Sequence, residues 1–307
     1  MQTAAIQSFP IRAVSEITGV NSVTLRAWER RYGLIKPMRT PKGHRLYSKQ
    51  DIELIQEILD RLSQGVSISQ IARDILNKTS MDGGEHSDVW GQYCRQMIKA
   101  VSRFDEHALE AVYNDAMSLY PVDVVTTRLI MPLLEELGKR WKEKAGSIAE
   151  EHFFSVYLRN KLGARFHHQN LRNSGPKLIM ACLPGEQHEF GILLFALTAH
   201  SKGYQVILLG ADLPVTELIQ VAERTDSQGV VLAGSASLNC NSVMEDINLL
   251  TGTISTPVFI GGDVSSTCRD DITKASAFPL GKDLVGSLYI IANRLHLSNT
   301  QAKAYSI

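Results

Sequence analysis

The sequence is poor in the features that hold secreted or membrane proteins together. Its 307 residues include four cysteines, and no two of them are close enough in sequence to form a CxxC metal or redox pair (Cys94, Cys182, Cys240 and Cys268). No apolar run approaches the roughly 18 residues of a membrane span. Residues 1–10 also lack the basic start and apolar block of a secretory signal. We therefore expect a reduced, cytoplasmic protein with no disulfide framework and no membrane partner.

The chain also lacks net charge, because Lys and Arg together number 32 and so do Asp and Glu. This balance hides an uneven distribution: the first fifty residues hold nine basic and two acidic side chains, a local charge of +7. A basic end on such a chain indicates a polyanionic partner at that end. The sequence has no nucleophile–base set, phosphate-binding loop or Rossmann dinucleotide fingerprint, so we expect no enzyme activity.

The basic segment has the pattern of two short helices joined by a tight turn. Apolar residues recur at helical spacing from Ile11 to Thr18, Gly19 ends that helix, and Asn21 offers an N-cap for the next one. The second helix ends near Gly33. A stretch with proline and glycine follows and predicts a two-stranded wing, and a capped helix with an apolar face comes after it. This order predicts a winged helix-turn-helix.

Basic side chains gather on the second helix and on the wing of this head. They are Arg26, Arg30 and Arg31 on one face of the helix, and Arg39, Lys42, His44 and Arg45 on the wing. Guanidinium groups bind phosphate and guanine edges in bidentate fashion. A solvated basic face is the ordinary alternative, but the order of helix, turn, helix and wing favours DNA binding.

The head resembles the DNA-binding domain of MerR-type transcription regulators. The match runs from Phe9 to Leu76, and the blocks that carry it read RAWERRYGL and GHRLY. The resemblance implies that the helix Thr24–Arg31 enters the major groove of operator DNA. The implied DNA-binding residues are Thr24, Arg26, Trp28, Arg30, Arg31, Arg39, His44, Arg45 and Tyr47. Metal-sensing members usually place cysteines after a long dimer helix, and no cysteine precedes Cys94, so metal sensing is disfavoured.

Three further segments follow the head, which we place at residues 8–76. Residues 77–89 are polar and glycine-rich and are predicted to be a linker. Residues 90–172 contain many helix formers, with apolar residues three and four apart, and predict a four-helix bundle. Residues 176–297 alternate short apolar strands with helices, which predicts a doubly wound parallel sheet. The expected fold class is therefore multidomain, α and α/β.

The loop from Leu183 to Gly191, with the sequence LPGEQHEFG, carries an isolated histidine between an apolar strand and an apolar helix. Ligands of doubly wound sheets bind at the carboxyl ends of the strands, so His188 is expected at the ligand edge. A neutral imidazole there can coordinate a metal through one nitrogen while Glu186 accepts a hydrogen bond from the other. The residues alone leave open whether His188 is a ligand or an ordinary surface residue.

Four short motifs resemble those of cobalamin-binding proteins. Glu186-x-His188-x-x-Gly191, the turn GSASL at 234–238 and the glycine pair at 261–262 resemble the signatures of cobalamin-binding domains. Trp141 with Glu151-His152 resembles the cap signature of light-sensing cobalamin regulators of the CarH and LitR type. The resemblance implies that His188 is the lower axial ligand of the cobalt. The implied cofactor-binding residues are His188, Glu186, Gly191, Trp141, Glu151, His152, Ser235, Ser237, Leu238, Gly261 and Gly262.

The combined resemblance spans nearly the whole chain and implies a Rossmann-like cobalamin-binding domain. It predicts a light-responsive repressor. Adenosylcobalamin would favour the dimer or tetramer that binds operator DNA, and light would release it. Two departures leave alternatives open: Glu186 stands where the signature has Asp, and Lys142 stands where some light sensors have His. One alternative is a MerR-type regulator that has lost or altered cobalamin use and answers to a partner protein or another ligand. The other is a corrinoid carrier for methyl transfer, which would not need the basic head.

Overall fold

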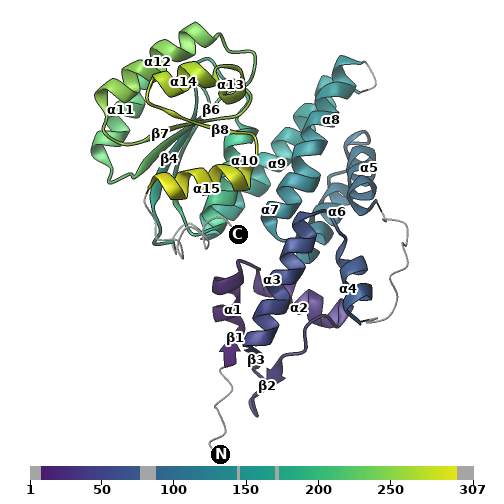
Figure 1. Ribbon diagram of the computed structural model, residues 1–307. Coiled ribbons are helices and arrows are strands. Elements are labelled where there is room, and N and C mark those ends of the chain that lie inside the picture. The colour runs from purple at the N-terminus through teal and green to yellow at the C-terminus, as the bar shows by residue number, and fades with distance from the viewer. Residues whose placement is uncertain (1–7, 77–87, 144–145, 170–172, 296–307) are drawn as a thin grey trace, which may run out of the picture. The chain divides into compact units, whose positions relative to one another are not determined.

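The computed structural model describes residues 8–76, 88–143, 146–169 and 173–295, which group into two units divided in sequence between Tyr157 and Leu158 (Figure 1). Residues 77–87 of the predicted linker lie outside the described part. In the described ranges, no helix combines the length and the apolar character that crossing a membrane requires. The first unit contains the head and most of the helical segment, and the second contains the sheet.

The head is a winged helix-turn-helix, as predicted. Its helical elements are α1 (Ile11–Thr18), α2 (Ser22–Ala27), the π-helical turn η1 (Trp28–Tyr32), α3 (Lys49–Ser63) and α4 (Ile68–Leu76). Gly19 ends α1 in the left-handed conformation, with φ 71°, and the Asn21 side chain caps α2 by accepting the Val23 N–H. The helix continues without a break from α2 into η1, so the predicted second helix runs to Tyr32.

Within residues 8–76, three antiparallel strands form the wing sheet, one more than predicted. They are β1 (Ser8–Pro10), β2 (Met38–Arg39) and β3 (Arg45–Ser48), in the order β1-β3-β2. The additional strand is β1, which precedes α1 and pairs with β3. Ser48 then starts α3 with a capping box, because its hydroxyl accepts the Asp51 N–H while the Asp51 carboxylate accepts the Ser48 N–H.

The predicted helical bundle is present and follows the head in the first unit. Its elements are α5 (Val89–Val101), α6 (Glu106–Leu119), α7 (Val122–Val125), η2 (Thr126–Ile130), α8 (Met131–Lys142) and α9 (Ile148–Gln169). The chain runs helically from α7 through the π-helical turn η2 into α8. Pro132 lies in the first turn of α8. A proline lacks an N–H and clashes with the carbonyl four residues earlier, so the wider turn before it accommodates the ring.

The described part of the second unit holds a parallel sheet of five strands in the order β5-β4-β6-β7-β8. The strands are β4 (Lys177–Cys182), β5 (Gln205–Gly210), β6 (Gly229–Ala233), β7 (Val258–Gly261) and β8 (Phe278–Gly281). The apolar segments of the sequence predict the first four of these strands but not β8. This edge strand has four residues, and Pro279 within it cannot donate to a ladder, which hides the strand pattern.

Helices cover both faces of this sheet, which gives the predicted doubly wound fold (Figure 1). One face carries α10 (Phe190–Ser201) and α15 (Leu284–Arg294), and the other carries α11 (Val215–Arg224), α12 (Cys240–Thr253), α13 (Val264–Thr267) and α14 (Arg269–Lys274). Strand β4 lies between β5 and β6. The loop that follows β4, residues 183–189, is therefore flanked by the loops that follow its two neighbours.

The structure joins two of the four cysteines, so the prediction of a chain without disulfides is wrong. Cys240, the first residue of α12, is bonded to Cys268, directly after α13, with the two Cα atoms 6.0 Å apart. The pair is distant in sequence, but β6 and β7 are neighbouring strands, so the segments that follow them lie side by side. The bond ties together the loops that follow these two strands.

Candidate functional site

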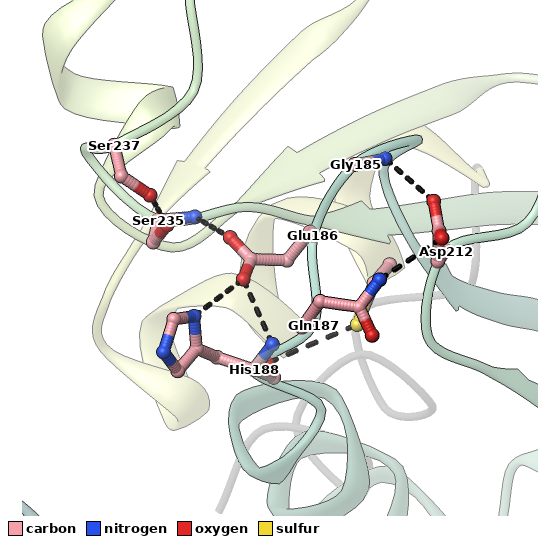
Figure 2. A network of polar contacts seen from close by, with 8 residues as sticks. Gly185, Glu186, Gln187, His188, Asp212, Ser235 and Ser237 are labelled. Atoms are coloured by element: carbon pink, nitrogen blue, oxygen red, sulfur yellow. Dashed lines mark hydrogen bonds and ion pairs between the residues drawn. The ribbon is translucent and has the colours of Figure 1, made fainter.

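The loop after β4 presents one nitrogen of His188 to solvent. The His188 side chain is 80 % exposed, and its Nδ1 lies 2.7 Å from Oε1 of Glu186 (Figure 2). The same Oε1 accepts the His188 backbone N–H at 2.8 Å. The hydrogen bond predicted between Glu186 and the imidazole is therefore present, and it fixes the ring so that Nε2 remains available.

Glu186 is buried beneath this loop and connects it to the next loop of the sheet. Its second oxygen, Oε2, accepts the backbone N–H of Ser235 at 2.6 Å. Burial alone would raise the pKa of Glu186, but the hydrogen bonds from Ser235 and His188 outweigh it and hold the pKa below its ordinary value. The carboxylate is thus ionised and only accepts hydrogen bonds, so the proton of a neutral His188 lies on Nδ1. Nε2 then carries a lone pair that faces outward.

Asp212, two residues after the neighbouring strand β5, holds the same loop from the other side. Its Oδ1 accepts the Gly185 N–H at 2.8 Å, and its Oδ2 accepts from the Gln187 side-chain amide at 2.9 Å (Figure 2). The Asp212 backbone N–H donates to the Glu186 carbonyl at 3.1 Å. Asp212 was not assigned a role from the sequence. The available signal was an acidic residue shortly after the apolar segment 206–209.

The serines and the glycine pair predicted to bind the cofactor lie at the end of β7 and in the loops that follow β6 and β7. The hydroxyl oxygens of Ser235 and Ser237 are 2.6 Å apart in the turn before α12. Leu238 is partly buried and packs against the core on one face of the sheet, where it supports the turn. Gly261 is the last residue of β7, and Gly262 follows it. The two serines and the two glycines therefore border the same edge of the sheet.

Two of the predicted glycines differ in what surrounds them. Gly262 has φ 82°, and a Cβ there would lie 2.4 Å from the carbonyl oxygen of Gly234. The absence of a side chain at Gly262 therefore permits the close approach of two protein loops, rather than of a ligand. At Gly191, in the first turn of α10, a Cβ would meet no described heavy atom within 4 Å other than those of its chain neighbours and of the helix backbone. That position is open, and a ligand could approach the backbone there.

The predicted cap residues lie in the first unit, around the break between α8 and α9. Trp141, near the end of α8, has a side chain that is 43 % exposed, which is unusual for a tryptophan in a helical bundle. Ser147 caps α9 by accepting the Glu150 N–H, and Glu151 and His152 follow in the first turns of that helix. His152 is exposed and Glu151 is half-buried. The side chain of Lys142 lies outside the described part.

The head exposes several of the side chains predicted to bind DNA. Arg26, Arg30 and His44 are exposed. On the wing, Arg39 and Arg45 both bind the carboxylate of Glu29 on η1, Arg39 at 2.9 Å. These hydrogen bonds outweigh the effect of burial and lower the pKa of Glu29, which stays ionised and neutralises part of the wing charge. Glu29 was not singled out from the sequence.

Three of the predicted DNA-binding side chains are buried in the head. Thr24 is 1 % exposed, and Trp28 and Tyr47 have no exposed surface. The Trp28 indole N–H donates to the Leu119 carbonyl at the end of α6, at 2.8 Å, so this residue joins the head to the bundle. Arg31, exposed beside it, pairs with Asp115 of α6 at 3.2 Å. We therefore remove Thr24, Trp28 and Tyr47 from the DNA-binding set, because side chains without surface cannot contact DNA in this arrangement.

Known proteins match all three parts of the chain. Residues 9–77 match the MerR HTH family of regulatory proteins, and residues 93–165 and 176–285 each match a B12 binding domain family. The chain is a MerR-type regulator with B12-binding domains. Its relatives CarH and CarA of Myxococcus xanthus, both HTH-type transcriptional repressors, are each 28 % identical to it. The CarH match covers 84 % of this chain and 90 % of CarH, and the CarA match covers 82 % and 85 %.

A solved structure has the same fold as the bundle and the sheet. The monomethylamine corrinoid protein of Methanosarcina barkeri superposes with a TM-score of 0.52 at 14 % identity, covering 66 % of this regulator and 99 % of that protein. At this identity the likeness shows the fold alone. The relatives of the regulator are themselves transcriptional regulators rather than enzymes.

The residues of the regulator fit a cobalamin. In the described ranges, no group of three or more His, Cys, Asp or Glu is gathered to hold a metal ion by itself. A corrin ring supplies the equatorial ligands of its cobalt, so the protein needs to add only one axial donor. The exposed Nε2 of His188, oriented through Nδ1 by the buried Glu186, is such a donor. Gly191 is exposed and has no side chain to stand between the loop and an approaching ring.

Proposed function

We propose that this regulator binds adenosylcobalamin as a light-sensing cofactor and controls operator binding through its oligomeric state, acting in the cytoplasm as a repressor. The observation that carries the proposal is the Glu186–His188 pair, in which one imidazole nitrogen is held and the other is presented. The similarity to the repressors CarH and CarA supports the regulatory part of the proposal.

The residues of the sheet unit would bind and orient the cofactor. His188 would donate Nε2 to the cobalt while Glu186 keeps the proton on Nδ1. Ser235, Ser237 and the segment 261–262 would border the nucleotide tail. When bound, adenosylcobalamin supplies a cobalt–carbon bond that light cleaves. Trp141, Glu151 and His152 would cover the adenosyl group.

The head would read DNA through its exposed basic side chains. Arg26, Arg30 and Arg31 would contact the major groove. Arg39, His44 and Arg45 would contact the backbone from the wing. A single head gives weak specificity, whereas paired heads in a dimer or tetramer read two half-sites and gain effective concentration. A cofactor that favours the assembled state would therefore favour DNA binding, as ligand-biased equilibria require.

The cofactor claim is tested by mixing the purified chain with adenosylcobalamin in darkness and removing unbound corrinoid by gel filtration. Wild type is expected to retain a corrinoid absorbance spectrum, and His188→Ala is expected to lose most of it or shift it. His107→Ala, which changes an exposed histidine of α6, is the matched control and should behave as wild type. Failure of wild type to retain the corrinoid would leave a regulator that answers to another signal.

The regulatory claim is tested separately by DNA gel shift and by oligomer size, before and after illumination. We expect a dark oligomer that binds operator DNA and an illuminated form that releases it. Arg45→Ala should weaken DNA binding by the dark oligomer, whereas Trp141→Ala should weaken only the response to light. A Trp141→Ala variant that still switches fully would contradict the cap assignment. Methyl transfer from methylcobalamin would point to the carrier function instead.

A further inference from the structure

The His188 loop is anchored from both of its neighbours in the sheet, and only one anchor belongs to the motif already discussed. On the β6 side, the anchor is the bond between Glu186 and the Ser235 N–H. On the β5 side, Asp212 contacts three consecutive residues, 185 to 187, through two side-chain hydrogen bonds and one from its backbone N–H. These residues immediately precede His188 and include the glutamate that orients it.

The backbone of Asp212 is shaped for this contact. Its φ is 50°, one of three positive values at non-glycine positions in the described ranges. Asp and Asn enter this left-handed region more readily than other residues with side chains. The carboxylate is also not used to cap the next helix, because the N-cap of α11 is Pro214. The side chain of Asp212 is thus directed back at the His188 loop.

We propose that Asp212 is a positioning residue for the axial histidine, an inference that rests on the proposed cobalamin function. By fixing the turn at 185–187 it holds the Glu186 backbone, and therefore the carboxylate that orients His188 Nδ1. Loss of its side chain frees the turn and lets the imidazole leave the orientation in which Nε2 faces outward. Asp212 itself touches neither the imidazole nor the site of the cobalt.

Three variants of the full-length chain separate this role from a general loss of structure. Asp212→Gly accepts the positive φ but lacks both side-chain hydrogen bonds. Asp212→Asn also accepts this φ, and its side-chain oxygen can still accept the Gly185 N–H. Its NH2 group can donate to the Gln187 side-chain oxygen once the Gln187 amide flips. Gln187→Ala removes one of the two bonds without changing the β5 loop. Only Asp212→Gly is expected to remove both side-chain anchors of the turn, while the bond from its backbone N–H to the Glu186 carbonyl remains.

The first readout uses the protein without cofactor. Hydrogen–deuterium exchange resolved at single amides reports the Gly185 N–H, bonded to Asp212, and the His188 N–H, bonded to Glu186. Because two hydrogen bonds are lost, we expect exchange in Asp212→Gly to accelerate on the order of tenfold at both amides. Asp212→Asn should stay near wild type, and Gln187→Ala should fall between them. Faster exchange at Gly185 alone would show a local contact without a positioning role.

The second readout is the share of bound, reduced cobalamin whose cobalt carries a protein histidine, measured by electron paramagnetic resonance of chains labelled with 15N-histidine. Asp212→Gly should shift the equilibrium against histidine ligation by on the order of tenfold, and Asp212→Asn should restore it. Equal shares in wild type and Asp212→Gly would overturn this inference alone. A wild type with no histidine on the cobalt would overturn the proposed function and this inference with it.

Discussion

In the head, side chains proposed to bind DNA are already engaged by the protein: Arg39 and Arg45 bind Glu29, and Arg31 binds Asp115. In the sheet unit, His188 is held through Nδ1 but presents Nε2 to solvent. DNA binding by those arginines therefore exchanges protein partners for phosphates, whereas metal binding by His188 displaces only water. The difference indicates that competition inside the chain limits DNA affinity, whereas the preorganisation of one loop sets cofactor affinity.

The largest expected effect is on the stability of the first unit. Trp28→Ala should lower its free energy of unfolding by about 3–5 kcal/mol, because a fully buried indole is lost from the junction between head and bundle. All three tryptophans of the sequence precede residue 158, so fluorescence of Trp90 and Trp141 during urea unfolding reports this unit. His188→Ala, the matched change in the sheet unit, should lower stability by no more than about 1.5 kcal/mol, because an exposed imidazole loses one hydrogen bond to Glu186. Equal losses of unfolding free energy in Trp28→Ala and His188→Ala would contradict this difference between the two units.

Breaking the disulfide should have the next largest effect, confined to the second unit. Cys240 and Cys268 are 28 residues apart, and a closed loop of this length stabilises the fold by roughly 3–4 kcal/mol through loss of unfolded-state entropy. Cys268→Ser is expected to lower the unfolding free energy of the sheet by about that amount, measured by hydrogen exchange of its strands. The tryptophan signal of the first unit should not change. A variant with unchanged exchange in the strands would show that the bond does not form in solution.

A smaller effect is expected on DNA affinity. Asp115→Asn removes the charge that Arg31 pairs with and keeps an acceptor for the Tyr93 hydroxyl, which is bonded to Asp115 at 2.7 Å. Because the pair is exposed, its loss should change stability by less than about 1 kcal/mol. DNA binding at low salt should strengthen about two- to fivefold, since freeing an exposed ion pair contributes at most about that much. Unchanged or weaker binding would show that Arg31 does not serve the DNA interface.

The smallest expected effect is on the pH dependence of the stability of the sheet unit. The pKa of Glu186 is lower in the folded protein than its ordinary value of 4.5, because the hydrogen bonds of its carboxylate outweigh burial. Its contribution to stability is therefore fully present above about pH 4.5 and is lost as the pH falls through the folded-state pKa. Glu186→Gln should flatten this part of the stability curve below pH 4.5, measured by hydrogen exchange of the sheet. Glu186→Asp should keep the pH dependence, and an unchanged curve in Glu186→Gln would contradict the account.

The features that could be predicted depend on residues close together in the sequence. Helical spacing and turn residues predicted the head and the bundle, and short apolar strands between helices predicted the parallel sheet. Glu186 and His188 are two residues apart, so their hydrogen bond could be expected from the sequence. Arginine-rich segments indicated where DNA could bind but not that Glu29 would pair with two of them.

The contacts that could not be predicted depend on the order of strands and the packing of helices. Asp212 reaches the His188 loop because β5 lies beside β4, and the cysteines meet because β7 lies beside β6. Trp28 and Leu119 are 91 residues apart, and their bond depends on how head and bundle pack. The amphipathic pattern of the second helix does not distinguish a tryptophan that faces DNA from one that faces the bundle.

The most direct test of the central claim identifies the axial donor of the cobalt. Chains grown with 15N-histidine and loaded with reduced cobalamin are examined by electron paramagnetic resonance, in which the nuclear spin of the axial nitrogen splits the cobalt lines. The account predicts doublets, which arise only from a labelled histidine, and predicts their loss in His188→Ala but not in His107→Ala. Triplets in the wild type would show that the cofactor keeps its own base on the metal, which would contradict the account.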